Sequence, residues 1–470
     1  MKRIVFVQRE IEDKLGPMIL VSYLKSKGFG AEIIINPFKN LKNILEIKPN
    51  LIGISFMSSS VEWAIKTCHF LKKHIPNTPI IVGGPHPTFF PNIIEQEGID
   101  IVCVGEGEKP LLYLMQSYDG TLSSIQDAPN CWIKNGKGIK KNSVSSLLTE
   151  EELSELPFSD RTHYFRYPAL KKSPHKKIWT SRGCPYNCSY CFNYKYKEIY
   201  KGLGKTVRQR SVDSVINELK DLKQQYKWKC LEIVDDQFLT SRDWVVEFCD
   251  KYHSLIGLPF TCNSTAKQIT HNIVGVLKRA GCKVVYFAVE SGVESIRKEI
   301  YNKPITDEDI YRAADALHTH DMPFLTFNMI GLPGESMEDI FKTVELNQKI
   351  KTSYPWCSIL QPYPGTKISE YMKEKGVDLL QHFSYSYFSK TLINDQYQMR
   401  IISNAQKLFT FFVKYNIGYK RFVSFIKNPY FKIDRLYPLV FYWYYGKDIR
   451  ARYRLSWFSL LRYWLYSKTT

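Results

Sequence analysis

The sequence predicts an α/β protein in three parts joined by one linker. Residues 1–135 are expected to form a doubly wound, Rossmann-like parallel sheet, and residues 176–375 a partial, TIM-like (β/α)6 barrel. In both parts short apolar runs alternate with amphipathic stretches, as in buried parallel strands joined by crossover helices. The alternation stops in residues 376–470, which are rich in aromatic side chains and show a mainly helical pattern. A charged, Ser-rich stretch over residues 136–175 is the expected linker.

Length and composition indicate a globular protein with several cores. The chain has 470 residues, of which 44% are apolar and 24% charged, and this excludes fibrous and low-complexity classes. The sequence has no run of about 20 apolar residues, so no transmembrane helix is expected. The first predicted strand begins next to the N-terminal residues, and no signal peptide is recognised before it. We therefore expect a cytoplasmic protein, whose 11 cysteines are metal ligands or buried apolar residues rather than disulfides.

Five apolar runs mark the expected strands of the first part. They are Ile4–Val7, Ala31–Ile35, Leu51–Ser55, Ile80–Val82 and Ile101–Val104. Amphipathic stretches such as Val61–Lys73 separate them. Doubly wound sheets bind ligands beyond the carboxyl ends of their strands, and Gly-rich turns follow the fourth and fifth runs, at 83–88 and 105–108. Each turn is a candidate binding loop, although glycine also serves ordinary tight turns.

Six further runs are the expected strands of the barrel. They are Lys177–Ser181, Leu231–Val234, Phe260–Cys262, Val284–Val289, Phe324–Met329 and Ser358–Leu360. Helical patterns separate them, for example Ser211–Leu222, which has one apolar face. Function is expected at the carboxyl ends of these strands.

Three cysteines follow the first of these strands. Cys184, Cys188 and Cys191 can bind three irons of a cubane iron–sulfur cluster and leave the fourth iron without a protein ligand. Zinc is the alternative, but a structural zinc site needs a fourth ligand. The candidates are His175, nine residues upstream, and Cys230, 39 residues downstream, and neither has the usual spacing. The pattern favours an iron–sulfur cluster.

The CxxxCxxC spacing, with Tyr190 before the last cysteine, resembles the signature of the radical S-adenosylmethionine (SAM) superfamily. The resemblance implies a [4Fe-4S] cluster whose open iron binds the amino and carboxylate groups of SAM. Reduction would then yield methionine and a 5′-deoxyadenosyl radical, which abstracts hydrogen from an unactivated position. Other strand ends are similar to family elements that contact SAM. The SAM-binding residues that the resemblance implies are Tyr190, Asp235, Asp236, Glu290, Ser291, Gly331, Pro333 and Gly334. Thr265 is a departure, since many relatives carry Arg near that position.

An α/β domain ahead of such a barrel resembles the cobalamin-binding branch of the superfamily, over roughly residues 1–375. The resemblance implies that the loops after the third, fourth and fifth strands line cobalamin. The implied lining residues are Ser55, Met57, Ser58, Gly83, Gly84, His86, Gly105, Glu106 and Gly107. The Asp-x-His-x-x-Gly motif that places histidine under cobalt is absent, and His86 is expected to be a wall residue. A cobalt with a vacant lower face favours uptake and release of a methyl group.

The C-terminal part is basic and aromatic. Residues 401–470 hold 13 Lys and Arg against two Asp, a net charge of 13 − 2 = +11, whereas the whole chain carries +19. They also contain 21 aromatic residues, including Trp457, Phe458, Tyr463, Trp464 and Tyr466. A helical cap on the barrel mouth and peripheral contact with an anionic membrane are compatible interpretations. RNA binding is a third interpretation. It is not favoured, because Cys68, Cys103 and Cys131 are 35 and 28 residues apart, unlike the second-cluster cysteines of tRNA-modifying relatives.

These observations lead to one functional hypothesis with two alternatives. The hypothesis is a radical SAM enzyme that methylates an unactivated carbon of a hydrophobic small molecule, using a [4Fe-4S] cluster, SAM, cobalamin and a flavodoxin- or ferredoxin-type electron donor. The first alternative is oxidation or ring closure without methyl transfer, as in anaerobic porphyrin cyclases. The second is a non-catalytic regulator that binds cobalamin and an iron–sulfur cluster. The sequence identifies no catalytic residue.

Overall fold

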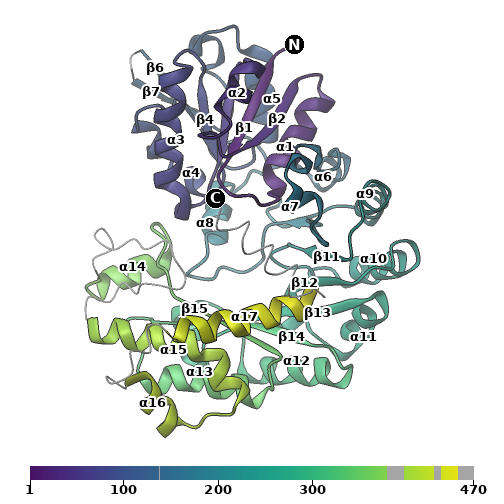
Figure 1. The fold of residues 1–470 in the computed structure, drawn as a ribbon, viewed down its shortest axis with the longest axis vertical. Coiled ribbons are helices and arrows are strands. Elements are labelled where there is room, and N and C mark those ends of the chain that lie inside the picture. Colours follow the sequence, from purple (N-terminus) through teal and green to yellow (C-terminus); the bar gives the residue numbers. More distant parts are fainter. Residues whose placement is uncertain (137, 378–395, 428–435, 454–470) are drawn as a thin grey trace. The chain divides into compact units, whose positions relative to one another are not determined.

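The computed structural model describes residues 1–136, 138–377, 396–427 and 436–453, which form two compact units (Figure 1). The N-terminal unit contains Met1–Ser173 and Lys195–Ser211, and the barrel unit contains Pro174–Tyr194 and the described residues of Val212–Leu460. The segment Lys195–Ser211 therefore folds with the N-terminal unit, although it connects two parts of the barrel unit in sequence. The domain boundaries at residues 135, 175 and 375 remain predictions.

The N-terminal unit has a seven-stranded sheet in the order β2-β1-β3-β4-β5-β6-β7. Its strands are β1 (Arg3–Gln8), β2 (Gly30–Ile35), β3 (Leu51–Ser55), β4 (Ile80–Gly83), β5 (Ile101–Cys103), β6 (Cys131–Asn135) and β7 (Gly138–Lys141). The first five are parallel and confirm the predicted strands. The antiparallel β6 and β7 were not expected. β6 ends at Asn135 and β7 begins at Gly138, and a short glycine-containing connection of this kind is a recognised hairpin signal.

Both faces of this sheet are buried, as the doubly wound class requires. Ile4 and Phe6 of β1 belong to one apolar core, and Val5 and Val7 belong to another, because successive side chains of a strand point to opposite faces. The helices are α1 (Leu15–Ser26), α2 (Leu41–Ile47), η1 (Ser58–Ser60), α3 (Val61–His74), α4 (Pro85–Phe89), η2 (Pro91–Glu95), α5 (Glu108–Ser117), η3 (Leu122–Ile125), α6 (Glu150–Glu155), η4 (Thr162–Arg166) and α7 (Pro168–Lys171). The expected linker thus holds β7, α6, η4 and α7, with buried side chains such as Tyr164.

The barrel unit is built on six parallel strands in the order β15-β14-β13-β12-β11-β8, with β8 and β15 at the two edges. Its strands are β8 (His175–Ile178), β11 (Cys230–Ile233), β12 (Phe260–Ser264), β13 (Cys282–Glu290), β14 (Phe324–Ile330) and β15 (Tyr354–Ile359), and the short β9 (Ser181–Arg182) follows β8. All six predicted strands exist, so the partial barrel is confirmed. β15 starts four residues earlier than predicted, because Pro355 is tolerated in an edge strand.

Helices separate these strands, as the pattern predicts. They are α9 (Val212–Gln225), α10 (Arg242–Leu255), η5 (Ala266–Gln268), α11 (His271–Ala280), the π-helical turn η6 (Ile296–Ile300), α12 (Asp307–Thr319), α13 (Met337–Lys349) and α14 (Lys367–Glu374). The short helix α8 (Asn193–Ile199) and strand β10 (Arg208–Gln209) belong to the stretch between β9 and α9. The predicted apolar face of α9 is buried from Val212 to Leu222.

The C-terminal region is helical in its described part, in α15 (Gln396–Lys414), α16 (Tyr419–Lys427) and α17 (Tyr437–Tyr453) (Figure 1). The α15 helix covers the edge strand β15: Gln406 Nε2 donates to the carbonyl of Cys357 at 3.0 Å, and Thr410 Oγ1 to that of Pro355 at 2.9 Å. Trp457, Phe458, Tyr463, Trp464 and Tyr466 lie outside the described residues. Within the described ranges, none of the helices combines the length and apolarity needed to span a bilayer.

Candidate active site

The three cysteines lie on the loop between β9 and α8. Gly183, with φ of 87°, makes the turn into this loop. Cys188 is 9% exposed, and Cys184 and Cys191 are half-buried. Burial raises the pKa of the Cys184 thiol to about 11, and it also raises the pKa values of Cys188 and Cys191. These thiols are protonated at neutral pH in the absence of iron, so metal binding must release their protons.

The donor set of this loop suits an iron–sulfur cluster. Three soft sulfur ligands on one loop are what a cluster needs, because each cysteine binds a different iron. Asn193 at the start of α8 donates its Nδ2 to Cys191 Sγ at 3.5 Å, a hydrogen bond of the kind that tunes clusters. In the described part of the chain, no three Cys, His, Asp or Glu side chains are close enough together to bind a single metal ion. A cubane cluster does not need such a group, because each cysteine binds a different iron.

The loop is held in place by the segment that follows η6. Ser189 donates its N–H to the carbonyl of Tyr301 at 2.9 Å and its Oγ to that of Ile300 at 2.6 Å. Asn302 Nδ2 donates to the carbonyl of Asn187 at 2.9 Å. These bonds fix the backbone between Cys184 and Cys191, so the sulfur positions do not depend on the loop alone.

Glu290 is buried at the carboxyl end of β13 in a strained backbone conformation. Its φ is +67°, in the left-handed region, and the pairing of β13 with β14 shifts register between Ala288 and Glu290. Glu290 Oε1 accepts from Tyr190 Oη at 2.6 Å and from Lys303 Nζ at 2.8 Å. Strain of this kind costs on the order of 1–3 kcal/mol and persists where the surroundings fix it, commonly at functional sites.

Lys303 is a charged group inside this site. Its side chain and that of Glu290 are each 7% exposed, and Lys303 Nζ also donates to Tyr190 Oη at 3.3 Å. Burial lowers the pKa of Lys303, but the charge of Glu290 opposes this effect and the net shift is upward. Burial and the Glu290 charge raise the pKa of Tyr190. Lys303 is therefore protonated at neutral pH, and it pairs with Glu290 beside the cysteine loop.

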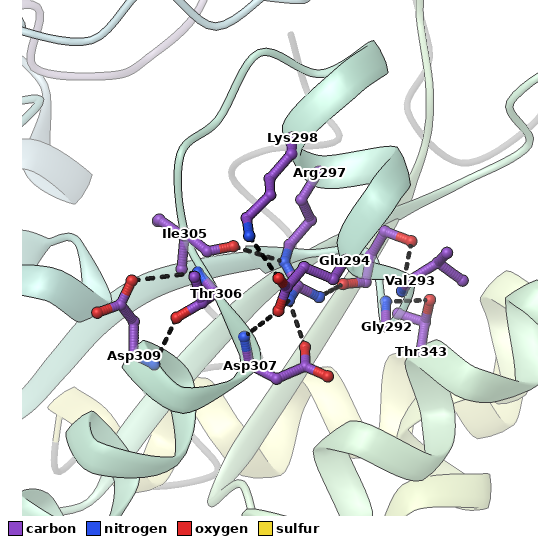
Figure 2. Close-up of polar contacts among 11 residues, drawn as sticks. Gly292, Val293, Glu294, Arg297, Lys298, Ile305, Thr306, Asp307, Asp309 and Thr343 are labelled. Carbon is purple, nitrogen blue, oxygen red and sulfur yellow. Dashed lines mark hydrogen bonds and ion pairs between the residues drawn. The ribbon is translucent and has the colours of Figure 1, made fainter.

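Arg297 connects Ser291 with the segment that carries Lys303. Figure 2 shows its contacts with Ile305 and Asp307. The Arg297 side chain is fully buried and donates to the carbonyl of Ser291 at 2.6 Å and that of Ile305 at 3.1 Å, and it pairs with Asp307. The carbonyl of Arg297 accepts from the N–H of Lys303 at 2.8 Å. One guanidinium thus fixes the backbone on both sides of the Glu290–Lys303 pair.

The two aspartates after β11 have different surroundings. Asp235 is 2% exposed, and its carboxylate accepts from the N–H of Thr180 at 2.6 Å, from Thr180 Oγ1 and from Ser181 Oγ at 2.9 Å. Burial raises its pKa to about 6, although these hydrogen bonds oppose the shift. Asp236 is exposed and accepts from Asn193 Nδ2 at 3.0 Å. Asp235 ties β8 to β11, and Asp236 lies beside the cysteine loop.

The turn after β14 is stabilised from within. Glu335 Oε2 accepts from the N–H of Gly331 at 2.7 Å and of Leu332 at 3.2 Å. Burial raises the pKa of Glu335 to about 7. Gly331 and Gly334 have φ values of 92° and 85°, which side chains rarely adopt. Pro333 lies between the two glycines. The hydrogen bonds from Gly331 and Leu332 to Glu335 therefore hold the predicted SAM-binding turn in one conformation.

In the N-terminal unit, the loops after β3 and β4 bring several predicted residues together. Ser58 Oγ lies 3.0 Å from His86 Nδ1, and the ring of Phe56 stacks on His86 with centroids 5.7 Å apart. Burial lowers the pKa of His86 to about 4, so the imidazole is neutral. A Cβ at Gly84 would lie 2.6 Å from Ser55 Oγ, which makes glycine necessary there. The Gly83-Gly84 turn thus packs closely on the β3 loop, and Met57 stays 56% exposed.

The third predicted loop, Gly105–Gly107, is in contact with the segment Lys195–Ser211. Tyr200 packs against Gly105, and Arg208 forms a bidentate ion pair with Glu106. Four residues of these sites were not predicted from the sequence: Tyr200, Arg208, Arg297 and Lys303. Each is a single residue outside any recognised motif, and its partners include residues from 6 positions away, as for Arg297 and Ser291, to 113 positions away, as for Lys303 and Tyr190.

Comparisons with known proteins cover both units. Residues 179–346 match the family model of the radical SAM superfamily, and residues 5–114 match that of the B12 binding domain. An uncharacterized methyltransferase of Pyrococcus horikoshii is 28% identical over 333 residues, which cover 70% of this chain and 71% of the relative. The anaerobic magnesium-protoporphyrin IX monomethyl ester cyclase of Rubrivivax gelatinosus is 21% identical over 414 residues, 83% of this chain and 72% of the cyclase.

The solved structure of the radical SAM methyltransferase TsrM from Kitasatospora setae has a similar fold. Its TM-score is 0.66 at 18% identity, over 81% of this chain and 77% of TsrM. The family matches confirm the predicted cofactor set of a [4Fe-4S] cluster, SAM and cobalamin, and they identify a radical SAM enzyme. The chain belongs to the radical SAM superfamily and carries a B12-binding domain before its radical SAM domain.

Proposed function

We propose that this enzyme methylates an unactivated carbon of a hydrophobic small molecule. The observation that carries the proposal is the state of His86, the one histidine among the predicted cobalamin residues. Its Nδ1 lies 3.0 Å from Ser58 Oγ and its ring stacks on Phe56, contacts that suit the predicted role of a wall residue. A cobalt without a histidine below it suits uptake and release of methyl groups. The methyltransferase relative from P. horikoshii supports the same reaction class.

We propose the following residues as the ones that hold the cofactors. Cys184, Cys188 and Cys191 would bind the cluster, and Ser55, Ser58 and His86 would line cobalamin. When bound, the cluster and SAM supply a deoxyadenosyl radical and cobalamin supplies the methyl group, because cofactors carry the hard chemistry in such enzymes. The chain itself binds and orients these groups.

We assign different tasks to the predicted SAM residues. The exposed carboxylate of Asp236, beside the cysteine loop, is suited to the ammonium of SAM. Glu290 and Ser291, fixed by Lys303 and Arg297, are suited to the ribose hydroxyls, and the Gly331–Gly334 turn is suited to the flat adenine. Asp235 acts through Thr180 and Ser181, whose positions it fixes.

A second function is favoured by a specific observation. The cyclase of R. gelatinosus matches 83% of this chain, a larger share than the P. horikoshii methyltransferase matches. Oxidation or ring closure without methyl transfer is therefore the alternative. A non-catalytic regulator is the third candidate.

Product analysis separates the three candidates. The full chain is purified without oxygen, reconstituted with iron, sulfide and cobalamin, and reduced in the presence of SAM and candidate hydrophobic substrates. Methylation predicts S-adenosylhomocysteine together with 5′-deoxyadenosine. Deoxyadenosine alone would favour the cyclase-type reaction, and a cluster without SAM cleavage would favour the regulator.

We also propose partners and a location. A flavodoxin- or ferredoxin-type protein in the cytoplasm would supply electrons, and the helical C-terminal region would contact anionic membranes. Tyr442 and Trp443 on α17 are 57% and 53% exposed, and aromatic side chains next to basic ones suit a membrane interface. The fraction of protein that co-sediments with anionic vesicles should decrease as the salt concentration rises. Binding that does not change with salt concentration would contradict the proposed membrane contact.

A further inference from the structure

The segment Lys195–Ser211 follows the cysteine loop in sequence but folds with the N-terminal unit. It begins four residues after Cys191. Within the N-terminal unit it contacts the Gly105–Gly107 turn, which is the predicted cobalamin loop after β5. Its contacts there come from two side chains, Tyr200 and Arg208.

Tyr200 holds the backbone of this turn. The side chain is 1% exposed, and its Oη accepts from the N–H of Glu106 at 3.0 Å and from Asn130 Nδ2 at 3.4 Å. Gly105 has φ of 84°, and a Cβ built there would lie 1.8 Å from Tyr200 Oη. The phenol therefore occupies the space that a side chain at position 105 would need, and it satisfies the next peptide N–H.

Arg208 holds the side chain of Glu106 in the same turn. Its guanidinium is 1% exposed and pairs with both Glu106 oxygens, at 2.8 Å and 3.1 Å. Arg208 Nη1 also donates to the carbonyl of Leu148 at 2.8 Å, and Glu106 Oε2 accepts from the N–H of Leu148 at 3.2 Å. The Glu106 carboxylate is thus engaged by three donors of the chain itself. Such bidentate pairs are geometrically specific.

We propose that Tyr200 and Arg208 are positioning residues for cobalamin. They hold the Gly105–Gly107 turn in the shape that lines the cofactor. Glu106 anchors this turn through its contacts with Arg208 and Leu148 and does not itself contact cobalamin. A segment after the cysteine motif therefore completes the cobalamin-binding unit. This inference rests on the proposed use of cobalamin at the loops after β3, β4 and β5.

Binding of cobalamin to the full chain tests the proposal. Cobalamin-free protein is titrated with hydroxocobalamin, and binding is followed by quenching of tryptophan fluorescence. Tyr200→Phe keeps the ring but leaves the Glu106 N–H without its acceptor, so the dissociation constant should rise about tenfold. Arg208→Met should weaken binding more, and Arg208→Lys should give an intermediate loss because it keeps the charge but not the bidentate geometry.

The matched control is Tyr252→Phe in α10. Tyr252 is 0% exposed, and its hydroxyl has no hydrogen-bond partner in the described residues. The control removes a buried hydroxyl of the barrel unit and should leave cobalamin affinity unchanged. Iron content per chain, measured in parallel, should be equal in all variants, because none of them changes the cysteine loop.

The measured cobalamin affinities decide between these possibilities. Weaker cobalamin binding by Tyr200→Phe and recovery of part of the Arg208→Met loss in Arg208→Lys support the proposal. Equal affinity of Tyr200→Phe and wild type overturns it, and so does an equal loss in Tyr252→Phe. If wild type itself binds no cobalamin, the proposed function fails, and the inference fails with it. If Tyr200→Phe is insoluble, the two Arg208 variants decide the question alone.

Discussion

The buried pair of Glu290 and Lys303 yields the sharpest stability prediction. Lys303→Met removes the cation and leaves a carboxylate that is 7% exposed without its ion partner. Breaking a buried ion pair from one side costs about 3–5 kcal/mol, because the remaining charge loses its compensation. At about 2–4 °C per kcal/mol for a unit of this size, the thermal midpoint should fall by roughly 6–20 °C.

Two further variants make this prediction specific. Glu290→Gln combined with Lys303→Met removes both charges and should recover most of the loss, since replacing a buried pair by neutral groups is often tolerated. Lys298→Met is the matched control: Lys298 pairs with Glu294 at 2.5 Å, but its side chain is 45% exposed. Surface pairs contribute about 0–1 kcal/mol, so its midpoint should fall by at most about 4 °C.

The assay is anaerobic thermal unfolding followed by tryptophan fluorescence, with all variants in the same buffer and at the same protein concentration. If Lys303→Met falls no further than Lys298→Met, the pair does not stabilise the barrel unit. If the double variant is as unstable as Lys303→Met, the loss comes from packing and not from the uncompensated charge. Either result would refute the charge assignment.

Two other predictions concern the same unit. Burial raises the pKa of Glu335 from 4.5 to about 7, so the folded chain binds this proton more tightly than the unfolded chain. The free energy of unfolding should therefore fall by about 3 kcal/mol as pH rises from about 4.5 to about 7. In a plot of thermal midpoint against pH, Glu335→Gln should have a flatter slope than wild type over this range. Equal slopes for wild type and Glu335→Gln would contradict the prediction. Gly292→Ala would place a Cβ 2.2 Å from the backbone of Lys342, whereas Gly16→Ala meets no atom within 4 Å. The free energy of unfolding, measured by urea titration, should fall by about 1–3 kcal/mol or more for the first variant only, and equal free energies of unfolding in the two variants would exclude the clash.

The strands could be predicted because they are buried on both sides. Runs such as Ile4–Val7 are apolar throughout, and this leaves a signal in the sequence that does not depend on distant residues. The start of β15 was missed because Pro355 interrupts the run, and only the sheet order shows that this strand is an edge. The hairpin of β6 and β7 was missed although Gly136 lies in the short connection between the two strands.

The site could be predicted only where a local pattern carries the chemistry. The cysteine spacing lies within eight residues, so it is visible without a fold. Lys303 and Arg208 are single basic residues in a chain with 65 Lys and Arg, and their burial depends on partners 13 and 102 positions away. The fold of Lys195–Ser211 with the N-terminal unit was equally invisible, because a segment between two barrel elements is expected to stay with the barrel.

Metal content tests the central claim most directly. Full-length protein and Cys188→Ala are purified without oxygen and reconstituted, and iron and zinc are counted per chain, with Cys249→Ala, a buried cysteine of α10, as the control. Wild type and the control should hold about four irons per chain, and Cys188→Ala should lose them. Zinc in place of iron in the wild type, or an intact cluster in Cys188→Ala, would contradict the assignment of Cys184, Cys188 and Cys191 as the cluster ligands.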